Sequence, residues 1–266
     1  MSNKKIRDFV SQFHFALITF FCVAVFLFSG FEKAIAQPKE KNALGYNIYK
    51  GDTINRKDKQ GRKQGPYYKF YKTDTVFYKG QFVNDKPQGT FTYYTEKGKL
   101  ESTLVWDATG TKATAKHYYE TGKLRAKGNY INQKKDSTWI YYNADDSLAS
   151  IENYKLGLRN GDFKVYYKTG GLARHEIYVA DKLNGPGREF FGDGKKKIEC
   201  TYKNGNLDGY YKLYYSTGFV HIEGPYKNGK RNGTWKLHKE DGTVIATDIF
   251  VDGKCKENNI EKATLE

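Results

Sequence analysis

The chain has 266 residues, a formal net charge of +15 and an aromatic content of 16%, with 23 Tyr and 27 Gly but only 1 Met. Length alone allows one or two domains. Abundant aromatic residues argue against disorder. The excess of Tyr, Gly and Lys disfavours a large globular enzyme core and favours many short strands joined by turns.

The first 36 residues are predicted to form a cleavable export signal. A basic segment at residues 4–7 precedes an apolar run over residues 15–28, and the segment ends in Ala34-Ile35-Ala36. This layout is typical of a secretory signal, and about 14 apolar residues are short for a membrane-spanning helix of ~20. We expect cleavage after Ala36 and a periplasmic, envelope-associated or secreted protein. An uncleaved anchor would leave the same domain outside the cytoplasm.

Residues 37–53 are predicted to be a linker, and residues 54–256 a repeat domain with a period of 24 residues. Ala113 and Ser137 occupy two points of the 24-residue grid, and a half unit begins near Ile54. Glycines occupy the other six grid points: Gly65, Gly89, Gly161, Gly185, Gly209 and Gly233. An aromatic follows every grid point at position +17: Phe82, Trp106, Tyr130, Tyr154, Tyr178, Tyr202, Tyr226 and Phe250. Self-similarity at a fixed period indicates a repeat architecture.

Each unit contains two turn signals, a Gly or Asp at position +9 and pairs such as Asn204-Gly205 at +19 and +20. Asn-Gly and Asp-Gly favour hairpins. We therefore predict an all-β fold, an elongated array of antiparallel β-hairpins that forms a single-sheet meander, with +11, +13 and +17 on one face. Aromatics at +2 and +5 require either a bulge or aromatics on both faces. We favour packing of +5 with +17 and +11, and +6 on the opposite side.

Two cysteines, Cys200 and Cys255, follow the export signal. They lie in units two repeats apart, which corresponds to roughly 20 Å at the spacing of neighbouring strands. A disulfide requires Cα atoms within about 7 Å of each other. We therefore expect no disulfide between them.

Residues 209–219 (GYYKLYYSTGF) and 225–236 (PYKNGKRNGTWK) resemble MORN-repeat proteins, and more closely the MORN-repeat variant family named after YwqK-type antitoxins. The resemblance covers residues 54–256 and implies a rod-like or curved antiparallel sheet with a binding or scaffolding role and no catalytic residues. The export signal departs from the cytoplasmic location that an antitoxin role assumes. Ala115 and Gly187 replace the +2 aromatic, which indicates a bend or a contact site.

The sequence contains no recognisable catalytic or metal-ligand constellation, so we predict neither an enzyme nor a cofactor. No second His or Cys stands at metal-ligand spacing from any of the four histidines after the signal, and no Ser or Cys has the setting of a catalytic nucleophile. Gly185-Pro186-Gly187 lacks the following helix that a phosphate loop needs. Glu152 and Glu176 share position +15 and are interpreted as solvated or lysine-paired. The four histidines are His117, His175, His221 and His238.

Positive charge is the general clue to a partner, since residues 37–266 carry 41 Lys and Arg against 28 Asp and Glu, a net charge of +13. We predict a protein-binding scaffold in the cell envelope or outside the cell. The alternatives are an anionic lipid or glycan binder, or an exported toxin-neutralising protein, which the family resemblance implies. Aromatics among basic residues also suit nucleic acid, which export disfavours. Lys-rich strands could equally serve only to keep the sheet soluble and its edges apart.

The predicted binding surface combines the +6 aromatics, taken as outward interface anchors, with clusters of basic residues. Its members are Tyr71, Tyr119, Tyr167, Phe191, Tyr215, Lys195, Lys196, Lys197, Lys230 and Arg231. Residues 257–266 are predicted to be a C-terminal tail. The oligomeric state is left open, edge-to-edge pairing of strands included.

Overall fold

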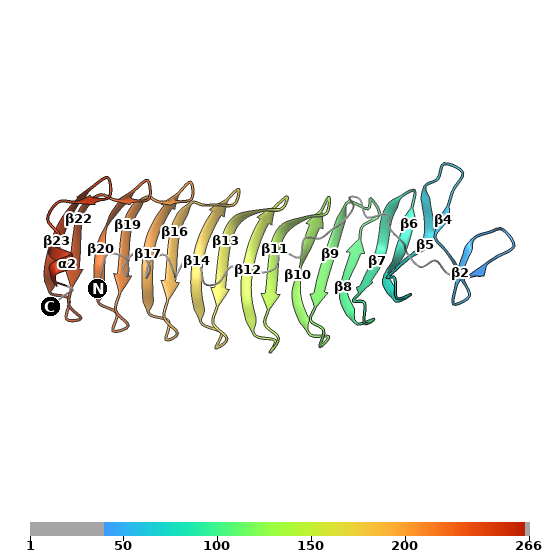
Figure 1. The fold of residues 1–266 in the computed structure, drawn as a ribbon, viewed down its shortest axis with the longest axis horizontal. Helices are drawn as coiled ribbons and strands as arrows, with labels where there is room; N and C mark the ends of the chain where they lie inside the picture. Colours follow the sequence, from blue (N-terminus) through green and yellow to red (C-terminus); the bar gives the residue numbers. More distant parts are fainter. Residues whose placement is uncertain (1–39, 264–266) are drawn as a thin grey trace. The chain divides into compact units, whose positions relative to one another are not determined.

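The computed structural model describes residues 40–263, which divide into two compact units. The N-terminal unit comprises residues 40–196 and 202–205, and the C-terminal unit comprises residues 197–201 and 206–263. Within each unit the strands follow one another in chain order (Figure 1). The predicted export signal lies outside the described residues.

Both units are built almost entirely from antiparallel strands. The first strands are β1 (Glu40–Lys41), β2 (Asn47–Tyr49), β3 (Asp52–Ile54), β4 (Arg56–Lys57), β5 (Lys63–Phe70), β6 (Val76–Val83), β7 (Lys86–Tyr94) and β8 (Leu100–Trp106). Next come β9 (Lys112–Tyr118), β10 (Leu124–Ile131), β11 (Lys134–Tyr142), β12 (Leu148–Lys155), β13 (Leu158–Tyr166), β14 (Leu172–Val179), β15 (Lys182–Leu183) and β16 (Gly185–Phe190). The last are β17 (Lys196–Lys203), β18 (Asn206–Leu207), β19 (Gly209–Tyr214), β20 (Val220–Lys227), β21 (Lys230–Arg231), β22 (Gly233–His238), β23 (Val244–Val251), β24 (Lys254–Cys255) and helix α2 (Asn259–Ala263).

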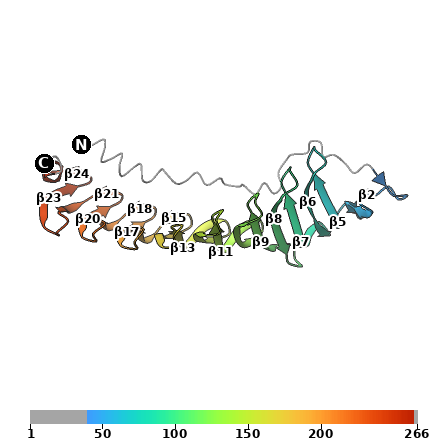
Figure 2. The same ribbon diagram turned by 90° about the horizontal axis from the view of Figure 1, so that it is seen from below.

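Strand pairing is that of a meander. In the N-terminal unit each strand from β4 to β14 pairs antiparallel with the next, and β14 pairs with both β15 and β16. In the C-terminal unit β17 pairs with β19, and the pairing continues through β20 and β22 to β23 and β24. The prediction of an all-β array of antiparallel hairpins is confirmed. In Figure 2 the short strands β18, β21 and β24 lie along one edge of the C-terminal unit.

The turn chemistry explains the 24-residue grid. All six grid glycines have positive φ, from 65° at Gly89 to 125° at Gly209, a region that a residue with a Cβ enters at a cost. Ser137 adopts φ 59° at its grid point. Ala113 instead lies in the regular strand β9, paired with Trp106 and Tyr130. The grid point therefore marks a backbone bend that the Ala113 unit lacks.

The core lies on one face of each meander, called the inner face here. In the N-terminal unit it contains positions +2, +13, +15 and +17, for example Phe91, Tyr78, Leu104 and Phe82. In the C-terminal unit Trp235 is fully buried and packs with Leu237, Ala246 and Ile260. The +17 aromatics are thus inner-face residues, as the sequence predicts. The opposite, outer face contains positions +1, +3, +14 and +16, because successive side chains alternate across a strand.

Large and small side chains alternate where +15 faces the +2 position of the following strand. A Cβ on Gly80 would lie 2.4 Å from the Phe91 ring, and one on Gly128 would lie 2.3 Å from Trp139. Where +15 is the larger Leu104, the facing +2 residue is Ala115, with 0% exposure. In the unit that begins at Ala113, the larger side chain of Leu104 thus compensates for the missing aromatic at position 115, and the +15 and +2 side chains stay close-packed.

The predicted pairing of +5 with +11 is confirmed, but the placement of these two columns on the same face as +13 and +17 was wrong. Phe70 pairs with Val76, and a register shift between Lys69 and Phe70 separates this pair from Tyr78 at +13. The hydroxyl of Tyr214 at +5 donates to the Glu199 carboxylate at +14, which lies on the outer face. Both faces therefore carry aromatics, and +5 and +11 are separated from the core columns by an extra residue at +12. Periodicity alone does not reveal a bulge of this kind.

Successive hairpins are stacked by a backbone ladder from position +20 to the residue two before the grid point. In the N-terminal unit Gly157 N donates to Lys135 O at 2.7 Å and Asp181 N to Arg159 O at 3.0 Å. In the C-terminal unit Gly229 N donates to Leu207 O at 2.8 Å. Through these hydrogen bonds each hairpin contacts the next one along the array.

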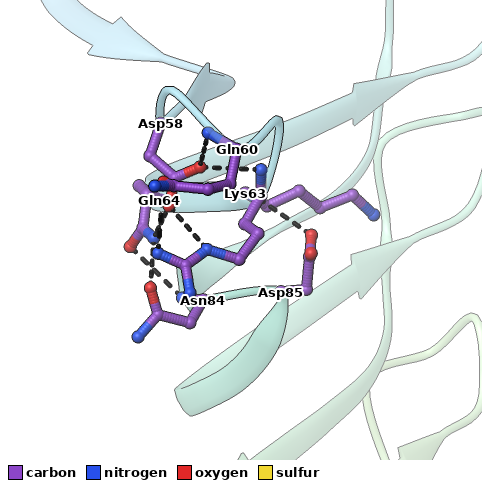
Figure 3. Close-up of polar contacts among 7 residues, drawn as sticks. Asp58, Gln60, Lys63, Gln64, Asn84 and Asp85 are labelled. Atoms are coloured by element: carbon purple, nitrogen blue, oxygen red, sulfur yellow. Dashed lines mark hydrogen bonds and ion pairs between the residues drawn. The ribbon is translucent and has the colours of Figure 1, made fainter.

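The first hairpin of the array is anchored by side-chain amides and carboxylates (Figure 3). Asp58 accepts hydrogen bonds from the backbone N–H of Gln60 and Arg62 and from Gln64 Nε2, at 2.9, 3.0 and 3.0 Å. Gln64 Nε2 also donates to Asn84 Oδ1 at 2.6 Å. Desolvation raises the pKa of Asp58, but the hydrogen bonds from Arg62, Gln64 and Gln60 together outweigh it and lower the pKa to about 2. The cluster is a closed hydrogen-bond network that links two neighbouring hairpins.

Both ends of the repeat domain carry added structure. Residues 40–54, placed mostly in the predicted linker, form the three-stranded sheet β1–β2–β3, and α2 lies in the predicted C-terminal tail. Asp248 Oδ1 and Oδ2 accept the N–H groups of Asn259 and Ile260 at 2.6 and 3.2 Å, which suits a carboxylate at a helix start. Lys256 N donates to Ile249 O at 3.0 Å. This cap occupies acceptors on the edge of β23, which limits pairing with other strands.

Candidate binding surfaces

The predicted +6 aromatics lie half-buried between hairpins. Their hydroxyls donate to the +5 carbonyl of the next unit: Tyr71 to Tyr94, Tyr119 to Tyr142, Tyr167 to Phe190 and Tyr215 to His238, at 2.9, 2.7, 2.6 and 2.8 Å. Phe191 occupies the same column without a hydroxyl. The Tyr71 ring also contacts Phe77 edge-on, with centroids 5.1 Å apart. These side chains therefore link successive hairpins, and their role as interface anchors stays a prediction.

The predicted basic residues have different surroundings. Lys195 Nζ lies 3.3 Å from the Asp193 carboxylate, which also accepts the Lys195 N–H, and these hydrogen bonds lower the pKa of Asp193. Lys195 and Lys196 belong to the N-terminal unit, whereas Lys197, Lys230 and Arg231 belong to the C-terminal unit. The structure places Lys230 and Arg231 together in β21.

Arg231 represents a column that sequence reasoning missed. Its guanidinium carbon lies 4.2 Å from the Trp235 ring centroid and 5.3 Å from that of Phe250. Lys63, Lys135 and Arg159 occupy the same position, two before the grid point, and also lie over aromatic rings. Cations at this position pack on the inner aromatics, so part of the positive charge is used for internal packing.

Lys135 of this column lies among three aromatic rings. Its ammonium lies 4.8, 5.1 and 5.0 Å from the ring centroids of Trp139, Tyr141 and Tyr154, and it donates to the Tyr141 hydroxyl at 2.5 Å. Tyr154 donates to Glu152 Oε2 at 2.5 Å. Burial raises the pKa of Tyr141 and of Tyr154. The half-buried Glu152 carboxylate thus joins a polar network that also contains Lys135, and its interpretation as solvated or lysine-paired stays a prediction.

Two further titratable groups lie on the inner face. Glu176 is 8% exposed, accepts from the Tyr178 hydroxyl at 3.2 Å and lies 3.7 Å from Arg174 Nε. His117 stacks on Trp139 with ring centroids 5.7 Å apart. Burial and then the nearby positive charges lower the pKa of His117 to about 4. A buried neutral imidazole on an aromatic stack is explained by packing.

The irregular Ala113 unit leaves a hollow of about 420 Å³ lined by Trp106, Tyr130, Asp107 and Asp136. Trp106 Nε1 is buried and has no hydrogen-bond partner among the described residues. Asp107 already accepts the Thr111 N–H, and Asp136 accepts that of Leu156. The carboxylates of the hollow are thus engaged by its own loops.

Within residues 40–263 no group of three or more His, Cys, Asp or Glu side chains is placed to hold a metal ion. The helical content of these residues includes no helix of the length and hydrophobicity that a bilayer crossing requires.

The outer face differs between the two units. In the N-terminal unit positions +1 and +16 include hydrogen-bonded polar pairs, with Thr114 Oγ1 donating to Asn129 Oδ1 at 3.2 Å and Thr138 Oγ1 to Asn153 Oδ1 at 2.8 Å. In the C-terminal unit the same positions pair Tyr210 with Pro225 and Thr234 with Ile249. Surface columns thus vary along an array whose core columns repeat.

The family model of the MORN repeat variant matches residues 113–132, 183–204 and 207–228. The first and third matched segments cover the hairpins β9–β10 and β19–β20, and the second covers strands β16 and β17. A comparison with curated proteins finds no match. The MORN-variant match and the hairpin array together indicate a repeat scaffold.

Proposed function

We propose that the chain is a non-enzymatic, exported scaffold that binds a protein partner through the outer face of its C-terminal unit. Three apolar side chains carry the proposal: Tyr210, Ile249 and Val251 are 52%, 43% and 45% exposed. Tyr210 faces Pro225 in the β19–β20 pair, and Gly233 of β22 lies against Pro225. Clustered exposed aromatic and aliphatic groups are typical of protein interfaces.

Photo-crosslinking tests this surface. A photoreactive residue replaces Tyr210 in one variant and Leu158, 47% exposed in the N-terminal unit, in the control variant. We expect position 210 to give one saturable protein adduct in envelope extract and position 158 to give none. Equal labelling from both positions, or no protein adduct at position 210, contradicts the proposal.

The proposal of export rests on the basic, apolar and small-residue layout of residues 1–36, which is typical of a secretory signal. N-terminal sequencing of the protein recovered from its producing cells tests it. We expect the mature chain to begin at Gln37. A chain that retains Met1 and stays in the cytoplasm contradicts export, and it leaves the crosslinking test of the partner surface unaffected.

A further inference from the structure

A row of basic residues crosses the outer face of the N-terminal unit. Cross-strand pairing joins Lys116 to Lys127, and Lys164 to His175. Read from β9 to β16 through consecutive pairs, the row consists of Lys116, Lys127, Ile140, Ile151, Lys164, His175 and Arg188. These seven residues include no acidic side chain. Asp162, two residues before Lys164 on β13, contacts His175 Nε2 through its Oδ1 at 2.5 Å. We call this set the basic outer row.

The same two columns in the C-terminal unit alternate in sign. Glu199 pairs with Lys212, Lys212 with Glu223 and Glu223 with Lys236. Lys212 Nζ lies 3.1 Å from Glu223 Oε2. The fold therefore accommodates opposite charges at positions +3 and +14. A row in which all charges are positive is not required for stability or for hairpin stacking.

The like charges of the basic outer row are unfavourable for the isolated protein. Lys116 and Lys127 are exposed and directly opposite each other, an arrangement that destabilises a strand pair. Among the described residues neither of them nor Lys164 has a carboxylate within ion-pair distance. Such uncompensated charge is favourable when an anion lies across the strands.

Two flanking rows narrow the chemistry of that anion. On one side are the hydroxyl and amide groups of Thr114, Asn129, Thr138 and Asn153. On the other side are half-buried tyrosines, and Lys127 Nζ lies 5.9 Å from the Tyr142 ring centroid. A base-stacking platform needs open aromatic faces. An interfacial membrane site needs apolar groups that enter the bilayer, whereas the apolar members of the row, Ile140 and Ile151, are half-buried. Cations beside hydroxyls and amides match a polymer that carries both acidic groups and hydroxyls.

We infer that the basic outer row binds a linear acidic polysaccharide that runs across the strands of the N-terminal unit. Its carboxylates or sulfates meet the lysines, and its hydroxyls meet the Thr and Asn side chains. Neighbouring contacts are spaced by the strand separation of about 4.8 Å. This binding involves a different ligand class and a different unit from the proposed protein partner, so neither depends on the other.

Equilibrium binding of the full chain to polygalacturonate tests the inference, with neutral dextran as the polymer control. The variant K116Q/K127Q removes two lysines from the basic outer row. The variant K212Q/K236Q removes two lysines from the same columns of the C-terminal unit. We expect wild-type binding that weakens with salt and about a tenfold higher Kd for K116Q/K127Q, with K212Q/K236Q close to wild type. K116Q/K127Q should melt at or above the wild-type temperature, because it removes a repulsion.

Three results would overturn the inference. One is the absence of wild-type binding to polygalacturonate at low salt. Another is an equal loss of affinity in the two double variants, which would indicate a general effect of net charge. The last is tighter binding to phosphatidylglycerol vesicles or single-stranded DNA with the same dependence on Lys116 and Lys127, which would assign the row to a lipid surface or to nucleic acid.

Discussion

The Tyr119 hydroxyl donates to the carbonyl of Tyr142, 23 residues later in the chain, at 2.7 Å. The same bond recurs from Tyr71, Tyr167 and Tyr215. Recurrence at one column means that the tyrosine contributes a hydroxyl as well as an aromatic ring. At the residue scale, these four tyrosines each make a hydrogen bond to the neighbouring hairpin.

Removing one of these hydroxyls should measurably weaken the array. We expect Tyr119→Phe to lower the free energy of unfolding by about 1 kcal/mol, since a half-buried carbonyl loses a donor. Tyr118→Phe is the matched control, because the Tyr118 hydroxyl makes no hydrogen bond within residues 40–263. Urea titration of both variants provides the measurement. Equal effects of the two substitutions would contradict the bridging role.

His117 should make stability depend on pH. The unfolded His117 binds a proton near its ordinary pKa of 6.5, whereas the folded one does so near 4. Between these values the unfolded state holds more protons, so stability falls as pH falls from 6.5 to 4, by at most about 3 kcal/mol. Above pH 6.5 the group contributes no dependence.

The phenylalanine variant separates this effect from other acid-sensitive groups. His117→Phe keeps an aromatic ring beside Trp139 and removes the titrating nitrogen. We expect the difference in free energy of unfolding between pH 7 and pH 4.5, measured by urea titration, to be smaller in the variant than in wild type. An unchanged difference would show that His117 is protonated equally in both states.

At the scale of the hairpin, a small residue at +15 faces a large residue at +2 of the next strand, and a large residue at +15 faces a small one. Gly80 and Gly128 leave room for Phe91 and Trp139, whereas Leu104 faces Ala115. Trp139 also donates from Nε1 to Asn129 O at 3.0 Å. The ring is thus fixed by both a glycine and a hydrogen bond across one strand pair.

Filling the space beside Trp139 should be destabilising. We expect Gly128→Ala to cost about 1–3 kcal/mol, because its Cβ would lie 2.3 Å from the ring. Gly192→Ala is the control, with no atom within 4 Å of its added Cβ and no positive φ. Thermal melting reports both.

A double variant tests the pairing itself. Trp139→Ala alone should cost about 3–5 kcal/mol. Gly128→Leu with Trp139→Ala recreates the Leu104 and Ala115 arrangement, so we expect its cost to be smaller than the sum of the two single substitutions. Simple additivity would contradict size matching between the two strands.

The sequence predicts the repeats well because their signals are local. Grid glycines and Asn-Gly pairs encode positive φ within two or three residues, and +17 aromatics recur without interruption. The face of +5 depends on an extra residue at +12 that breaks the period of two, and the pattern contains no mark for it. The same holds for Glu176, since it is buried whereas Glu152 in the same column is only half-buried.

The candidate surfaces were harder to predict for a related reason. Arg231 and Tyr119 belong to repeat columns. A residue type that recurs in every unit is more strongly determined by packing between hairpins than by a ligand. Residues that differ between units at one outer column, such as Asn153 and Ile249, are the informative ones. A column-by-column comparison of the units identifies these residues. It requires the strand register, because the register determines which face of the sheet each column occupies.

At the scale of the whole molecule, the two units share core columns and differ in outer ones. The N-terminal unit presents lysines beside Thr and Asn, and the C-terminal unit presents Tyr210 and Ile249 beside paired charges. In such a repeat scaffold the inner-face side chains stabilise the array, whereas the outer-face side chains differ between units and are available for recognition. We therefore expect binding of a partner to depend on outer-face side chains.

The most direct test is the affinity of the partner captured at position 210 for Y210S/I249S and for the control L156S/L158S. The control removes apolar side chains of similar exposure, 49% and 47%, from the N-terminal unit. We expect at least about a tenfold higher Kd for Y210S/I249S with unchanged melting, and a Kd close to wild type for the control. Equal Kd values for the two double variants would contradict binding through the outer face of the C-terminal unit.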